Sequence, residues 1–219
     1  MKQKTIFIAA IILLGVAFIG ATQFYRSHKA QQAEQSAARN RESLVRFHSP
    51  TMGSADAPVH IVEFLDPACE TCAAFYPLVK KLMAENPDKI RLTVRYAPFH
   101  RGSDEVVKAL EAARKQGKYW QALEALLAGQ ASWTLNHTAR VELVWPLLVR
   151  EGLDVARIRN DMGSAEIARA IEQDLADGLA LNVTKTPEYF VNGRPLPQFG
   201  FDELKALVRE ELAKAAAGN

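Results

Sequence analysis

The sequence is poor in cysteine and in net charge. Its 219 residues contain two cysteines, and 27 basic against 25 acidic side chains leave a formal net charge of +2. Two closely spaced cysteines cannot form the disulfide framework that supports a small secreted fold. The balanced charge implies neither nucleic-acid binding nor an acidic partner. The 48% hydrophobic content is ordinary for a globular protein, and the length predicts one good-sized domain with additional segments.

Charge is also absent from residues 5–25, a stretch about as long as a bilayer-spanning helix requires. We therefore predict that residues 1–25 form an N-terminal transmembrane helix that anchors the protein. A cleaved signal peptide is the alternative, with Gly20-Ala21 as a weak cleavage site. The bulky pair Phe24-Tyr25, followed by Arg26, is more typical of the interfacial end of an uncleaved anchor.

The composition then divides the rest of the chain. Residues 26–57 are polar and predict a solvated helix or flexible tether, with no sustained heptad for a coiled coil. Proline, glycine and serine gather at residues 49–58, where we place the domain boundary. The predicted catalytic domain is residues 58–219.

This domain begins with the pattern of a β-α-β unit. Residues 60–65 are mostly apolar at consecutive positions, which predicts a strand buried on both faces. A helical stripe follows from Ala73, and Pro77 is expected to kink that helix. Residues 90–96 alternate apolar with polar, which predicts a half-exposed strand.

Helical periodicity dominates residues 103–178, where we find no strand signal, so we predict an all-helical insertion there. Residues 188–191 then predict a short strand, Asn192-Gly193 a hairpin turn, and residues 194–198 the return strand. A final amphipathic helix is expected from Phe201.

The two cysteines, Cys69 and Cys72, form a Cys-x-x-Cys pair between the first strand and its helix. Free N–H groups and the dipole at a helix N-terminus favour thiolate over thiol, so Cys69 is a candidate nucleophile. The pair is a redox couple, half of a metal site, or chance. A haem-attachment motif is excluded because Ala73, and not histidine, follows the second cysteine.

Two motifs resemble the DsbA family of the thioredoxin superfamily. One is Val62-Glu63-Phe64-Leu65-Asp66-Pro67-Ala68-Cys69-Glu70-Thr71-Cys72, and the other is Thr184-Lys185-Thr186-Pro187-Glu188-Tyr189-Phe190-Val191-Asn192-Gly193. The resemblance implies an α/β, thioredoxin-like fold and protein thiol–disulfide oxidoreductase activity without a cofactor. Cys69 would then attack and Cys72 would resolve the mixed disulfide.

The resemblance also implies roles for other residues. Pro187 would be cis and would leave the Thr186 backbone free to pair with an extended substrate, whereas a trans proline opening an edge strand is the alternative. The family has an acid at the position of Glu63, and a buried carboxyl suits proton exchange with the resolving thiol. A carboxylate at the strand edge, either hydrogen-bonded or wet, is the alternative for Glu63.

The residues between the cysteines depart from the family. Strong oxidants of the DsbA type usually carry Pro-His there, whereas this chain has Glu70-Thr71. A negative charge at Glu70 should oppose the Cys69 thiolate, so we predict a weaker oxidant. Oxidase, reductase and isomerase directions all stay open.

The sequence assigns no catalytic role to three histidines. His100 follows Pro98-Phe99 and could lie near the site, although a surface-loop histidine is the preferred interpretation, and His48 and His137 are unassigned.

The leading hypothesis is an enzyme of the bacterial inner membrane whose domain faces the extracytoplasmic side. Its partners would be cysteine-containing proteins and a membrane partner, either a quinone-linked oxidase or a reductant. One alternative is a copper(I) or other soft-metal module that binds through Cys69 and Cys72. A redox-inactive peptide-binding domain is another.

Overall fold

The computed structural model describes the backbone of residues 2–217, and side chains from residue 13 onward except those of residues 16, 26, 29, 30 and 33. Its main sheet has five strands in the order β1-β3-β2-β6-β7. Strands β2 and β3 are parallel, as in a β-α-β unit, while β6 runs antiparallel to β2. The strands are β1 (Thr51–Met52), β2 (Val59–Leu65), β3 (Ile90–Tyr96), β6 (Glu188–Val191) and β7 (Arg194–Pro195).

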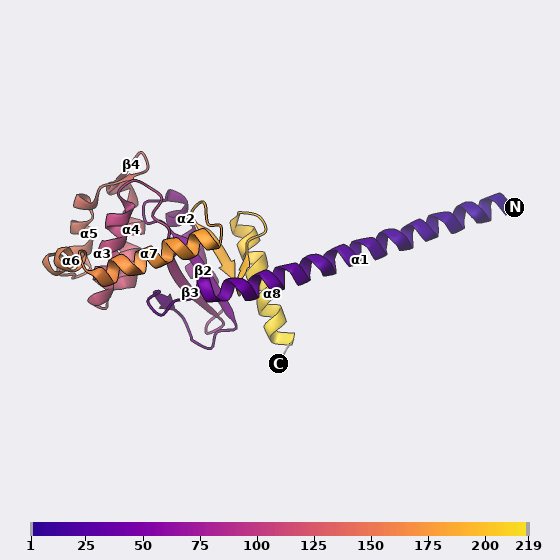
Figure 1. The fold of residues 1–219 in the computed structure, drawn as a ribbon, viewed down its shortest axis with the longest axis horizontal. Coiled ribbons are helices and arrows are strands. Elements are labelled where there is room, and N and C mark those ends of the chain that lie inside the picture. The colour runs from indigo at the N-terminus through magenta and orange to yellow at the C-terminus, as the bar shows by residue number, and fades with distance from the viewer. Residues whose placement is uncertain (1, 218–219) are drawn as a thin grey trace.

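Helices surround this sheet and fill one end of the domain (Figure 1). They are α1 (Lys2–Leu44), α2 (Glu70–Glu85), α3 (Ser103–Lys115), α4 (Tyr119–Ala128), α5 (Trp145–Arg150), α6 (Val155–Asp161), α7 (Ala165–Ala180) and α8 (Phe201–Ala217). Short 3-10 turns occupy Gln130–Ser132 and Val141–Leu143. The element order confirms the thioredoxin-like α/β fold.

The two faces of the sheet carry separate cores. Alternate residues of a strand face opposite sides, and in β2 Ile61 and Leu65 lie in the core beneath α2 and α8, together with Cys72. On the opposite face Val62 and Phe64 pack in a smaller core that includes Leu44 of α1. Both faces of β2 are therefore buried, as its run of consecutive apolar residues predicts.

The prediction of a half-exposed β3 is wrong. Arg95 is fully buried, because α7 and the end of α1 cover the polar face of this strand. Its guanidinium contacts Asp174 at 2.8 Å and Asp177 at 2.6 Å, and it donates to the carbonyl oxygen of Ser43 at 2.6 Å. At Arg95, the polar position of the alternating pattern is thus occupied by a buried ion network and is not exposed to solvent.

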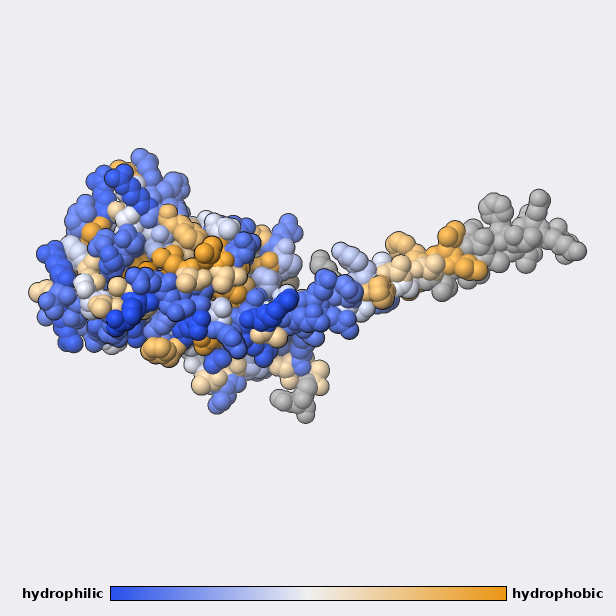
Figure 2. Space-filling model, in the orientation of Figure 1, coloured by the Kyte–Doolittle hydropathy of each residue, from blue (hydrophilic) through white to orange (hydrophobic). Residues whose placement is uncertain are grey.

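Helix α1 has two parts. Its C-terminal end packs on the domain, where Ala37 and Leu44 are buried and Asn40 donates to the Gly193 carbonyl oxygen at 3.0 Å. The N-terminal part extends away from the domain, and its described side chains include exposed apolar ones (Figures 1 and 2). Beyond the helix, Arg46 forms an ion pair with Asp177 at 2.6 Å. The final part of the predicted tether is therefore docked on the domain.

Among the described residues, no helix combines the length and the apolarity needed to cross a membrane. The side chains of residues 5–12, which form much of the apolar centre of the predicted anchor, lie outside the described part of the structure. The anchor thus stays a prediction.

The insertion is helical apart from one small hairpin. Strands β4 (Thr134–Leu135) and β5 (Thr138–Ala139) pair antiparallel across Asn136 and His137. The prediction that residues 103–178 contain no strand is therefore wrong. Strands of two residues are too short to produce a periodicity that can be recognised in a sequence. In α2, the helix continues through Pro77 to Glu85.

Candidate active site

The cysteine pair lies where β2 passes into α2. Cys69 is the N-cap residue of α2 with an extended backbone, and its carbonyl oxygen accepts from the Ala73 N–H at 3.1 Å. Cys72 lies inside the first turn and is fully buried, whereas Cys69 keeps 5% of its surface exposed. Both thiols are free. Cys69 thus retains a small exposed surface, whereas Cys72 has none.

The two thiols have very different acidities. Interaction with the Cys72 thiol, helped by the Thr186 side chain and the backbone N–H groups of Cys72 and Thr71, lowers the pKa of Cys69 to about 5. Burial opposes this shift. In Cys72, burial raises the pKa well above 9.0, and the nearby Cys69 and Glu63 add to the rise. Near neutral pH the outer cysteine is therefore a thiolate and the inner one a thiol.

Thr186 and Pro187 lie directly against this pair. The Thr186–Pro187 peptide bond is cis, and Sγ of Cys69 lies 3.3 Å from the Thr186 carbonyl oxygen. Pro187 is buried, Thr186 is half-buried, and β6 begins at the next residue. The second motif of the sequence is thus brought to the first, about 120 residues away in the chain.

Glu63 lies in the centre of β2, between Val94 of β3 and Tyr189 of β6. It is fully buried, and among the described residues neither its carboxyl oxygens nor the Tyr189 hydroxyl has a hydrogen-bond partner of ordinary geometry. Burial raises the pKa of Glu63 to about 8, the nearby Tyr189 offsets part of this rise, and Cys69 adds to it. A wet carboxylate at a strand edge does not describe this residue.

Asp66 organises the loop before Cys69, and we assigned it no role from the sequence. One of its oxygens accepts from the Ala68 N–H at 2.8 Å. The other contacts the backbone N–H of His100 at 2.8 Å and its ring Nδ1 at 2.7 Å. The interpretation of His100 as a plain surface-loop residue is therefore wrong. The sequence feature that could have indicated this contact is Asp66, which directly follows a buried strand.

Gln130 is a second residue that the sequence did not reveal. It is buried, and its amide nitrogen donates to the carbonyl oxygens of Pro67 at 2.8 Å and Cys69 at 3.0 Å. The helical insertion thereby supports the cysteine loop. No local pattern marks a glutamine some sixty residues from its partners.

The two residues between the cysteines face solvent. Thr71 is exposed, and the exposed Glu70 carboxylate lies 3.1 Å from Nδ1 of His137 in the β4–β5 turn. The rings of His137 and His100 stack with centroids 5.7 Å apart. Glu70 thus points toward two histidines.

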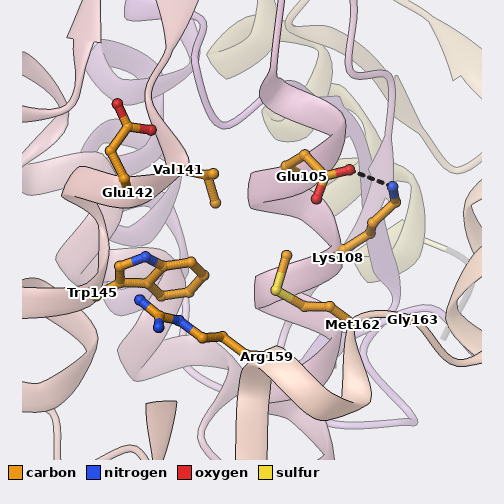
Figure 3. A pocket seen from close by; sticks show the side chains of 8 residues that line it. All are labelled: Glu105, Lys108, Val141, Glu142, Trp145, Arg159, Met162 and Gly163. Carbon is orange, nitrogen blue, oxygen red and sulfur yellow. Dashed lines mark hydrogen bonds and ion pairs between the residues drawn. The ribbon is translucent and has the colours of Figure 1, made fainter. Parts of the chain in front are cut away.

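A separate cleft of about 490 Å³ lies in the helical region, away from these groups (Figure 3). Its lining includes Trp145, with the Arg159 guanidinium 4.9 Å from the ring centroid, and an ion pair between Glu105 and Lys108. None of the predicted site residues lines this cleft.

The fold and the site define a class, namely thioredoxin-like proteins with a Cys-x-x-Cys pair at a helix N-terminus and a cis-proline beside it. A family model described as thioredoxin matches residues 47–210. A probable disulfide bond formation protein D from Bacillus anthracis is 30% identical over 173 residues, which cover 75% of this chain and 78% of that protein. A thioredoxin-like oxidoreductase from Silicibacter pomeroyi superposes with a TM-score of 0.69 at 28% identity, over 80% of this chain and 98% of that one.

Another group of relatives is much longer. The Na(+)/H(+) antiporter NhaA of Herminiimonas arsenicoxydans is 33% identical over 144 residues, which are 66% of this chain and 22% of the antiporter. The chain thus spans about a fifth of the length of these relatives. From these matches, the chain belongs to the thioredoxin family, and it is similar to a disulfide bond formation protein D over most of that protein's length.

Proposed function

We propose that the protein transfers disulfides to cysteine-containing proteins through Cys69 and Cys72. The observation that carries this proposal is the asymmetry of the pair. Cys69 keeps a small exposed surface and lies against Thr186, whereas Cys72 is fully buried one turn along. An outer sulfur can be attacked to form a mixed disulfide while the inner sulfur leaves, and in the reverse direction the inner sulfur resolves that mixed disulfide.

The exchange proceeds in two steps with balanced electrons. A substrate thiolate attacks Sγ of Cys69 in the oxidised enzyme, forming a mixed disulfide and releasing Cys72 as a thiolate. A second substrate thiolate then attacks the substrate sulfur of that mixed disulfide. The substrate gains a disulfide and loses two electrons, and Cys69 leaves as a thiolate.

Glu63 supplies the proton that the first step requires. With a pKa of about 8 its carboxyl is mostly protonated near neutral pH. The departing Cys72 thiolate is strongly basic, because burial raises the pKa of Cys72 well above 9.0. Proton transfer from Glu63 to Cys72 therefore moves the buried negative charge onto the less basic of the two groups. The reverse proton transfer, from Cys72 to Glu63, serves the opposite direction of disulfide exchange.

The acidity of Cys69 favours the oxidising direction. A thiolate that is stable near neutral pH stabilises the reduced enzyme, which makes its disulfide a better oxidant. The pKa of about 5 for Cys69 supports this direction. Glu70 would weaken it, although its carboxylate lies beside His137 rather than alone.

Thr186 and the cis-Pro187 form the substrate-binding edge in this proposal. The Thr186 carbonyl oxygen contacts Cys69, so a peptide that pairs with this backbone would place its cysteine sulfur at the reacting atom. The expected substrate segment is extended and contains cysteine.

Location and recycling complete the proposal. Residues 1–25 would anchor the protein in the inner membrane of a bacterium, with residues 58–219 on the extracytoplasmic side, where disulfides persist. A quinone-linked membrane oxidase is the partner that would return Cys69 and Cys72 to the disulfide state.

A trapping experiment tests the exchange. The oxidised protein is mixed with a reduced, unfolded protein that contains cysteines, and free thiols and mixed disulfides are followed. The wild-type protein should consume two thiols per turnover, Cys72→Ala preloaded with glutathione on Cys69 should accumulate a mixed disulfide with a version of the substrate that has a single cysteine, and Cys69→Ala should do neither. If thiols are not consumed and copper(I) binds tightly at one equivalent, the soft-metal alternative replaces this proposal.

A further inference from the structure

The side chains of Glu70, His100 and His137 meet at the solvent side of the cysteine loop. They come from the first turn of α2, the loop after β3 and the β4–β5 turn. One ligand-type atom from each residue lies within 4.8 Å of the other two. The redox chemistry proposed above uses neither histidine.

Backbone pairing holds the two histidines side by side. Arg101 and Thr138, the residues directly after them, form an isolated parallel β-bridge. The Ala139 N–H donates to the Arg101 carbonyl oxygen at 2.8 Å. The imidazole rings consequently stack at 5.7 Å, so bringing them together requires no rearrangement of the main chain.

His100 is also oriented in the way that metal-binding histidines usually are. Its Nδ1 lies 2.7 Å from an oxygen of the fully buried Asp66. Ser103 donates to the same carboxylate oxygen at 3.1 Å, which fixes its position. A carboxylate on one ring nitrogen sets the tautomer and leaves the other nitrogen, Nε2, as the ligand.

His137 occupies an unusual backbone position for a side chain of its size. It follows Asn136 in the two-residue turn between β4 and β5, and both residues have positive φ, at 49° and 55°. Glycine is strongly preferred at the second position of such a turn. A histidine here places an imidazole over Glu70 at some conformational cost, and this pattern is common at functional sites.

We propose that Glu70, His100 and His137 form a zinc(II) site at the entrance to the cysteine pair. In a tetrahedral zinc site, bonds of about 2.0–2.2 Å to nitrogen and oxygen place ligand atoms roughly 3.3–3.5 Å apart. The Glu70 carboxylate and Nδ1 of His137 are 3.1 Å apart, so this pair already has the required spacing. One ring nitrogen of His100 lies within 4.8 Å of the other two ligand atoms, so its separations from them need to shorten by up to about 1.5 Å.

The ligand set suits zinc and leaves a fourth position open. Two imidazoles and one carboxylate are a known zinc-binding combination, with water completing the tetrahedron. Glu70 and His137 are exposed and His100 is half-buried, so the ion can enter from solvent. An ordinary surface ion pair between Glu70 and His137 is the competing explanation, and it requires neither His100 nor Asp66.

Zinc binding by the full-length, untagged protein tests this inference. Cys69→Ser/Cys72→Ser serves as the background, so that no thiolate contributes a ligand and the result is independent of redox activity. Calorimetry with Zn²⁺ should give one site, and Co²⁺ in its place should give the visible absorption of a tetrahedral nitrogen–oxygen site.

Two single changes in this background identify the ligands. His137→Gly suits the turn and removes one imidazole, and Glu70→Gln keeps the size of the side chain. Each should weaken zinc binding at least tenfold, whereas His28→Ala, which removes a histidine far along the chain, should leave it unchanged. An absence of zinc binding in the background protein, or binding that survives both changes, overturns the inference.

Discussion

Replacement of Glu63 by glutamine should stabilise the protein and at the same time slow its chemistry. The carboxyl is fully buried, and burial raises its pKa from 4.5 to about 8. A group whose pKa is higher in the folded state stabilises the fold below its unfolded pKa, and this contribution is lost as pH rises through the folded pKa. Between pH 5 and pH 8 the loss amounts to about 3–4 kcal/mol, at 1.36 kcal/mol per pKa unit.

Urea unfolding of the reduced protein at pH 5, 6, 7 and 8 measures this loss. Glu63→Gln lacks the titrating group, so its unfolding free energy should gain about 3–4 kcal/mol relative to wild type between pH 5 and pH 8. Glu85→Gln, at the exposed end of α2, is the matched control and should follow wild type. If the difference between Glu63→Gln and wild type stays constant with pH to within about 1 kcal/mol, the buried, protonated Glu63 described here is incorrect.

Three further predictions concern the supporting residues. Arg95→Met removes the guanidinium from the buried network and leaves Asp174 with only His48 and the Tyr96 N–H as partners, so it should lower the unfolding free energy by about 3–5 kcal/mol, measured by urea unfolding; a loss below about 1 kcal/mol would contradict the buried network. Gln130→Ala removes two hydrogen bonds to the cysteine loop and should cost about 1–3 kcal/mol in the same assay, so an unchanged midpoint would show that the loop does not need it. Glu70→Gln should lower the pKa of Cys69 by roughly half a unit, as followed by the pH dependence of its alkylation, since an exposed charge is worth below about 1 kcal/mol; an unchanged pKa would remove Glu70 from redox tuning.

Local sequence patterns predicted the fold well because the main elements are long and periodic. Strand β2 is apolar at consecutive positions and is buried on both faces, and the motif at residues 184–193 leads into β6 and its turn. The position of Cys69 at the N-terminus of α2 also follows from a strand that passes directly into a helix. These features depend on neighbours in the chain.

The parts that were not predicted depend on distant partners. Arg95 alternates with apolar residues as an exposed residue would, and only its acidic partners on α7 show that it is buried. His100 and Gln130 acquire their roles through Asp66 and through the backbone of the cysteine loop. A pattern of neighbouring residues cannot reveal such pairings, because the partners lie tens of residues away in the chain.

The reduction potential of the purified protein tests the central claim most directly. The protein is equilibrated with glutathione buffers, and the Cys69–Cys72 disulfide is quantified, with Cys69→Ser as the control. A Cys69 pKa of about 5 lies between those of thioredoxin and DsbA. We therefore expect one two-electron transition between about −270 and −120 mV, and none in the control. A potential below about −270 mV would contradict the oxidising direction, and the absence of any transition would contradict disulfide exchange itself.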